Sequence, residues 1–296
     1  MENVQKNIRT DEMVEKIPIR LLKNKLYKGL FFFAAFFTFI LLIVLLAQIF
    51  SQGASHLSWD FLQNFASRRP EQAGIKAALI GTVWMMAVVV PVSLLLGVGT
   101  AIYLEEYASK NRLTRFIQMN ISNLAGVPSV VFGLLGLTIF VRILFFGNSV
   151  LAAGLTMSLL ILPVIIVASQ EAIRAVPKEL REASYGLGAT KWQTILRVVL
   201  PSAIAGILTG SILAFSRAIG ETAPLVVIGI PAFVAFLPKN VFDQFTALPM
   251  QIYNWTSRPQ EEFHFLAAAG IIVLLVILIL MNSIAVWIRN RYENKR

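Results

Sequence analysis

Two residues of opposite charge interrupt an otherwise apolar stretch, residues 202–237. Arg217 and Glu221 are four residues apart and therefore meet on one side of a helix. An arginine in hydrocarbon costs at least about 2.5–3.5 kcal/mol on insertion scales, and charged residues inside a membrane commonly mark a transport pathway. The planar guanidinium group matches the oxygens of an oxyanion. Arg217 and Glu221 are therefore predicted to line a pathway for an oxyanion, with Glu221 holding Arg217 between passages.

A second interpretation of this pair stays open. Arg217 and Glu221 would then neutralise one another and serve only to hold the helices in place. Both interpretations require the stretch to cross the membrane.

A second group of informative residues lies in the polar connection 170–200. Pro177 is suited to the first turn of a helix, and Glu179 and Glu182 follow where the positive end of the helix dipole favours them. Gly186 and Gly188 supply the backbone freedom that ends a helix and turns the chain. These residues predict a short helix followed by a glycine turn.

Thr190 and Gln193 have the spacing of a capping box, so a second short helix should run from there to about Leu200. Pro201 is expected to open the next span. Such a pair could lie on lipid headgroups, or it could be a DNA-binding helix-turn-helix. The DNA-binding alternative is set aside because both ends are tethered to the membrane, and no nucleic-acid partner is predicted.

Small residues recur every four positions through the same apolar stretch. Along a helix they form one stripe that lets another backbone approach closely, and this face is predicted to pack on protein. The stripe consists of Ser202, Gly206, Gly210, Ala214 and Ala218.

The composition indicates that the helices carrying these residues are membrane helices. The chain has 296 residues, 57% of them hydrophobic and 14% charged, with a mean hydropathy of +0.72. About 20 apolar residues span a bilayer. Five stretches approach that length without interruption and 202–237 is the sixth: residues 27–50, 77–104, 121–146, 149–169 and 264–288. Four tryptophans are predicted interfacial anchors: Trp59, Trp84, Trp255 and Trp287.

The distribution of positive charge predicts the orientation. With residues 1–26 in the cytoplasm, six spans return the tail 289–296 to the cytoplasm. The cytoplasmic segments then hold 19 Lys and Arg residues and the outer segments five, as the positive-inside rule requires. The chain therefore divides into an N-terminal tail, a six-span domain (27–288) with the cytoplasmic loop 170–200, and a C-terminal tail.

Several function classes are excluded by what the sequence lacks. It contains no cysteine, and its two histidines, His56 and His264, are far apart, so no metal site is predicted. No GxxxxGK[ST] phosphate loop is present, so the chain does not bind ATP by that device, and the energy of any active transport must come from another polypeptide or from an ion gradient. No catalytic constellation was found, and the two halves show no clear internal similarity, which argues against a carrier built from two repeats.

The loop also resembles a known signature. Glu182-Ala183-Ser184, Gly188 and Val198-Val199-Leu200-Pro201 resemble the EAA motif of bacterial ATP-binding-cassette importer permeases, with Ser184 and Val198 as mild departures. The resemblance implies an all-α polytopic membrane protein of six transmembrane helices with the type I ABC importer permease (MetI-like) architecture. It further implies that Glu182, Ala183 and Gly188 belong to a coupling loop that docks on an ATPase subunit.

Three further segments resemble the permeases of the phosphate-specific (Pst-type) importer, and one subunit type in particular, the PstA-like permease. They are residues 216–225, residues 246–255, and Gly126-Val127-Pro128-Ser129 with Phe132-Gly133. With the EAA-like loop, the resemblance extends over about residues 79–287. The N-terminal tail lies outside it.

The resemblance implies a permease subunit of a phosphate importer in the bacterial inner membrane. Its expected partners are a homologous second permease, a cytoplasmic ATPase dimer, an external phosphate-binding protein and membrane lipid. This chain would bind no cofactor, and the partner ATPase would use ATP and Mg. Another oxyanion (sulfate, molybdate or phosphonate) stays open as the substrate, as do an ATP-independent channel or carrier.

Overall fold

The computed structural model describes residues 17–293, and within that range the chain is helical with no strand. The only pairing of strand type there is an isolated bridge between Ser149 and Gln244. The predicted all-α fold is therefore confirmed. The chain divides into two compact units, residues 1–51 and 52–296.

The first unit consists of helix α2 (Ile17–Gly53) up to Ser51. Its 37 residues would extend about 56 Å at 1.5 Å per residue, which exceeds the roughly 30 Å hydrocarbon core of a bilayer. Part of α2 must therefore project beyond the membrane. The boundary predicted for the N-terminal tail, residues 1–26, is therefore wrong in part, because residues 17–26 already belong to helix α2. Residues 1–16 lie outside the described residues.

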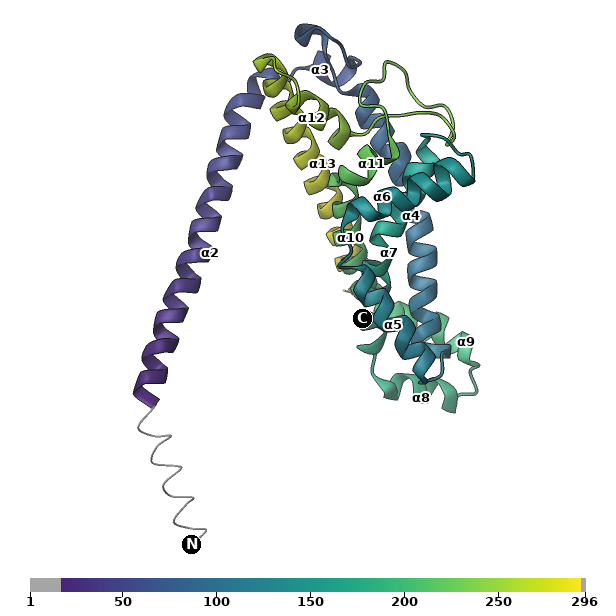
Figure 1. Cartoon of the computed structure of the whole chain (residues 1–296). Coiled ribbons are helices and arrows are strands. Elements are labelled where there is room, and N and C mark those ends of the chain that lie inside the picture. The colour runs from purple at the N-terminus through teal and green to yellow at the C-terminus, as the bar shows by residue number, and fades with distance from the viewer. Residues whose placement is uncertain (1–16, 294–296) are drawn as a thin grey trace. The chain divides into compact units, whose positions relative to one another are not determined.

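The second unit contains the remaining helices (Figure 1). Three short π-helical segments, η3 (Tyr103–Tyr107), η4 (Leu137–Ile143) and η5 (Ile195–Val199), continue or precede longer helices. The α-helices are α3 (Trp59–Gln63), α4 (Lys76–Ile102), α5 (Arg112–Leu124), α6 (Ser129–Gly136), α7 (Val150–Arg174), α8 (Lys178–Gly186), α9 (Lys191–Thr194), α10 (Leu200–Gly220), α11 (Ala223–Ile228), α12 (Leu248–Thr256) and α13 (Glu261–Glu293). The predicted tail 289–296 is helical as far as Glu293, and residues 294–296 lie outside the described range.

The number of candidate spans agrees with the sequence, but one of them is broken. Five described helices are long and apolar enough to cross a membrane, and a sixth span results if α5 and α6 count as one. The expected continuous helix over 121–146 is wrong, because α5 and α6 meet at 104°. Pro128 lacks an amide hydrogen and disfavours helical backbone at Val127, so the chain turns there.

The core of the second unit lies where α4, α7 and α10 pack together. Met85, Met157 and Ile161 are fully buried in this cluster. A Cβ added to Gly97 of α4 would lie 2.6 Å from Ile165 Cγ2 of α7, and one added to Gly154 of α7 would lie 2.7 Å from Val88 Cβ of α4. The glycines thus allow α4 and α7 to approach closely along their length.

Helices α8 and α9 lie at one end of the bundle, and α3 and α12 at the other (Figure 1). At the α12 end, Trp255 is fully buried and its ring centroid is 5.9 Å from that of Phe61. Leu248 N donates to Thr82 Oγ1 at 2.9 Å, which ties this segment to α4. The prediction of Trp255 as an interfacial anchor is therefore wrong, because residues 245–255 fold back into the protein.

A turn over Lys239 to Asp243 precedes α12 and contacts the start of α7. The backbone amides of Lys239 and Asn240 donate to Asp243 Oδ2 at 2.7 and 3.1 Å. The Lys239 bond is the main reason that the pKa of Asp243 lies below its usual value. Asp243 O in turn accepts from Val150 N at 3.1 Å, so this turn completes the first hydrogen bonds of α7.

Candidate functional site

The predicted loop 170–200 is formed by the end of α7, by α8 and by the start of a long helix. Pro177 is the residue directly before α8, and Glu179 is in its first turn. At the other end, Leu187 N donates to Ala183 O and Gly188 N to Tyr185 O, at 3.2 and 2.9 Å. The short helix and its turn are where the sequence places them.

Gly188 has a φ of +82°. This left-handed conformation costs residues other than glycine about 1–2 kcal/mol. A Cβ added there would meet no atom within 4 Å, so the backbone angle alone accounts for glycine at this position. Gly186 ends α8 without a positive φ.

Thr190 and Gln193 form the capping box that the spacing predicts, with Gln193 N donating to Thr190 Oγ1 at 3.3 Å and Thr190 N to Gln193 Oε1 at 2.8 Å. The helix that starts there does not end near Leu200. It continues through η5 into α10, giving one helix over Lys191–Gly220. Pro201 lies in the first turn of α10, as expected, but α10 follows directly on the π-helical turn η5, so the predicted end of the second helix near Leu200 is wrong.

Side-chain contacts join α8 to α9, and α9 to the end of η3. Ser184 Oγ lies 2.9 Å from Thr194 Oγ1, and Lys191 Nζ lies 4.8 Å from the centroid of the Tyr107 ring. Alanine is the usual residue of the EAA signature at position 184 and could not make this hydrogen bond. The departure from the signature therefore adds a contact between α8 and α9.

Helix α8 and its turn expose large apolar side chains among charged ones. Glu182 and Ala183 are exposed, and Glu182 has no ion pair within residues 17–293. Leu187 is 90% exposed. Other exposed large apolar side chains nearby are Leu180, Tyr185 and Trp192. Exposed apolar side chains of this size are a feature that interaction surfaces share.

The stripe of small residues on α10 faces α7 over part of its length. A Cβ added to Gly206 would lie 2.7 Å from the Cβ of Ala172, and a Cβ added to Gly210 would lie closer still to the Cβ of Ala168. Ala214 and Ala218 are buried in the core, and Ser202 at the start of the stripe is half-buried.

Arg217 and Glu221 lie at the far end of α10 from α8. Arg217 Nε is 3.7 Å from Glu221 Oε2, and the side chains are 43% and 21% exposed. Neither side chain makes a hydrogen bond with another described residue. The guanidinium donors are therefore available to a ligand on the open side of the pair.

The chain breaks its helix at Glu221, and this break orients the pair. Glu221 adopts an extended conformation (φ −79°, ψ 127°), and Pro224 in the first turn of α11 restarts the helix. Helix α11 then packs on α6, where a Cβ added to Gly133 would lie 2.9 Å from Pro224 Cα. Two of the segments that resemble phosphate permeases are thus in direct contact.

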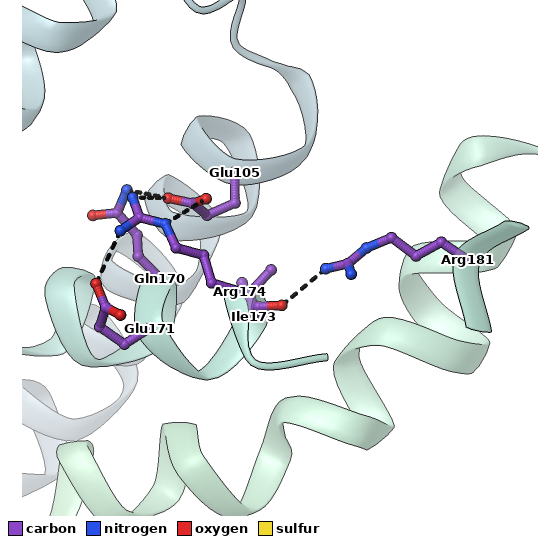
Figure 2. A network of polar contacts seen from close by, with 6 residues as sticks. All are labelled: Glu105, Gln170, Glu171, Ile173, Arg174 and Arg181. Atoms are coloured by element: carbon purple, nitrogen blue, oxygen red, sulfur yellow. Dashed lines mark hydrogen bonds and ion pairs between the residues drawn. The ribbon is translucent and has the colours of Figure 1, made fainter. Parts of the chain in front are cut away.

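Sequence reasoning missed a network of charged residues beside α8 (Figure 2). Arg174 donates to both oxygens of Glu105, from Nε at 2.9 Å and from Nη2 at 2.6 Å, and Gln170 Nε2 donates to the same carboxylate at 2.8 Å. Arg181 pairs with Glu106 at 3.1 Å. The sequence shows adjacent carboxylates and two arginines seven positions apart, but it does not show that the ends of α4 and α7 are neighbours.

Residues 93–294 match the family described as "Binding-protein-dependent transport system inner membrane component". The chain belongs to this family. The match includes the connection from α7 to α10 and the Arg217–Glu221 pair. The family resemblance that the EAA-like loop indicated is thereby confirmed, and the chain is a transport subunit of the inner membrane type.

Two relatives and one solved structure support this assignment. The chain is 32% identical over 281 residues to the probable ABC transporter permease protein YqgI of Bacillus subtilis, covering 91% of this chain and 96% of that protein. It is 34% identical over 276 residues to the phosphate transport system permease protein PstA 1 of Mycobacterium tuberculosis, covering 91% and 90%. A bacterial ABC transporter involved in alginate import matches with a TM-score of 0.62 and 18% identity, over 90% of this chain and 98% of that one. These similarities confirm the ABC importer permease fold and the PstA-like type of sequence.

Proposed function

We propose that this chain is a permease subunit of an ATP-driven importer of inorganic phosphate and forms half of the translocation pathway. The observation that carries the proposal is the 34% identity to a phosphate transport permease over nearly the whole length of both chains. The guanidinium of Arg217, which is ion-paired with Glu221 but makes no hydrogen bond with another described residue, fits an oxyanion substrate.

Uptake measurements with competitors test the substrate. Cells that depend on this importer should take up labelled phosphate, and excess unlabelled phosphate should compete, whereas sulfate, molybdate and phosphonate should not. Competition by sulfate at the same concentration as phosphate would assign the subunit to a broader or different oxyanion importer. Uptake that persists after ATP depletion would instead indicate a channel or an ion-coupled carrier.

The ATPase partner is proposed to dock on α8 and its turn, through Glu182, Ala183 and Gly188. The exposed Leu180, Tyr185 and Leu187 support a protein contact there. ATP and Mg would be used by that partner, with no cofactor on this chain. A full importer further requires a homologous second permease, a second ATPase copy and an external phosphate-binding protein, which should copurify from detergent.

We also propose that both termini are cytoplasmic. The α8 end of the bundle carries the basic 170–200 connection, and the opposite end carries the short outer helices (Figure 1). Because the chain has no cysteine, single cysteines can be introduced and labelled with a membrane-impermeant reagent in intact cells. Cysteines at Gln72 and Phe242 should react from outside, and those at Lys110 and Lys178 only after lysis. Labelling of Lys178→Cys in intact cells would reverse the orientation and contradict ATPase docking at α8.

A further inference from the structure

Two adjacent carboxylates at the end of α4 contact both sides of the connection between α7 and α8. Glu105 and Glu106 lie on η3, which continues α4. Glu105 accepts from Arg174 in the last turn of α7, and Glu106 accepts from Arg181 of α8. The π-helical turn therefore presents one carboxylate to each side of the connection; Figure 2 shows the Glu105 side.

Arg181 makes contacts with three elements at once. Its Nε and Nη2 donate to Glu106 Oε1 at 3.2 and 3.1 Å. Its Nη1 donates to Val176 O at 2.6 Å, and Nη2 also donates to Ile173 O at 2.8 Å. The last carbonyls of a helix have no partner within it, so Arg181 satisfies the end of α7 while it joins α8 to the end of α4.

This pair is shielded from water, whereas the neighbouring one is more open. The side chains of Arg181 and Glu106 are 17% and 9% exposed, and that of Arg174 is 48% exposed. Shielded charges interact more strongly than exposed ones. Among the described residues, Arg181–Glu106 is also the one ion pair that links α8 to η3.

Packing restrains α8 on only part of its surface. A cavity of about 1020 Å³ lies between α8, η3 and the start of α5, and Arg181, Tyr185 and Arg112 are among its lining residues. On that side α8 faces this opening, and Arg181 reaches across to Glu106. Helix α8 is held to α9 by the Ser184–Thr194 hydrogen bond, and the Arg181–Glu106 pair is its ion-pair link to the end of α4 among the described residues.

We propose that Arg181 and Glu106 are positioning residues that transmit the movement of α8 to the transmembrane helices α4 and α7. The inference rests on the proposed docking of the ATPase on α8. A rigid link at this point makes a displacement of α8 shift the end of α4, whereas a loose link lets α8 move alone. Loss of the pair should then uncouple ATP hydrolysis from transport.

The test uses the whole importer in proteoliposomes and measures phosphate transported per ATP hydrolysed, normalised to assembled complex. Glu106→Gln keeps the shape and an acceptor but removes the charge, and it leaves Arg181 shielded without its partner. We expect this ratio to fall about tenfold or more, because α8 would lose its ion-pair link to the end of α4 and could move without it. A variant that assembles less well but keeps the wild-type ratio would overturn the proposal.

Glu171→Gln is the matched control. Glu171 pairs with Arg174 at 2.9 Å within α7, its side chain is 65% exposed, and it contacts neither α8 nor η3. The same acid-to-amide change there should leave the ratio unchanged. An equal fall in both variants would indicate a general electrostatic effect and contradict the specific role of Glu106.

Replacing the ion pair by a covalent cross-link distinguishes loss of the connection between α8 and η3 from a general folding defect. In this cysteine-free chain, Glu106→Cys with Arg181→Cys should uncouple the importer, and joining the two thiols with a short bifunctional reagent should restore the ratio. Failure of the joined protein to recover would overturn the inference. A wild-type complex that transports no phosphate would contradict the proposed function instead, so the two failures are distinguishable.

Discussion

Replacing Arg217 by lysine should lower phosphate uptake about 10- to 100-fold while assembly of the importer stays normal. Lysine keeps the positive charge but cannot offer the planar fork of donors. One lost hydrogen bond to a charged group is worth about 1.5–3 kcal/mol, which corresponds to a change of this size. The measurement is initial uptake in proteoliposomes, with assembly checked by copurification of the partner subunits.

A double variant separates the pathway role of Arg217 from a structural one. Arg217→Gln leaves Glu221 without its partner, although the 43% exposure of Arg217 means a smaller cost than the roughly 3–5 kcal/mol of a fully buried pair. Arg217→Gln with Glu221→Gln removes both charges. If Arg217 handles phosphate, assembly recovers in the double variant and uptake stays lost. Recovery of uptake would refute the pathway assignment.

Replacing Gly188 by proline should abolish phosphate-coupled ATP hydrolysis without preventing membrane insertion. Proline requires φ near −65°, whereas Gly188 has a φ of +82° and its amide donates to Tyr185 O. Neither condition can be met, so the turn after α8 must rearrange and displace Glu182 and Ala183. The measurement is ATP hydrolysis by the purified complex with and without the phosphate-binding protein.

Two further variants test whether the positive φ of residue 188 is what makes the Gly188→Pro change harmful. Gly188→Asn should retain more activity than Gly188→Pro, because asparagine tolerates left-handed backbone better than most residues. Gly186→Ala should be silent, since that position is helical and a Cβ there meets no atom within 4 Å. Full activity of Gly188→Pro would show that this turn is not part of the coupling element.

Local chemistry allowed the region around α8 to be predicted almost residue by residue. Capping boxes, glycines with positive φ and prolines act over a few positions, so Thr190, Gln193 and Gly188 lie where their types require. The same local reasoning failed at the end of the second short helix. A proline near Leu200 suggested a break, but the helix runs through η5 into α10 without one.

The bend between α5 and α6 and the burial of Trp255 illustrate a second limit. Hydropathy counts apolar residues but does not distinguish a straight span from two shorter helices at 104°. It also cannot distinguish a tryptophan that faces lipid from one packed on Phe61. Both environments are apolar, so the composition is the same in each case.

By itself, the sequence determined that the chain is a helical membrane protein of the importer permease type, and it located the α8 turn and the Arg217–Glu221 pair. Those properties follow from segment length, charge distribution and contacts between residues close in sequence. The tertiary structure alone decided that Glu105 and Glu106 meet Arg174 and Arg181, roughly 70 positions away. Such pairs depend on which helix ends become neighbours when the bundle packs, and no local pattern encodes that choice.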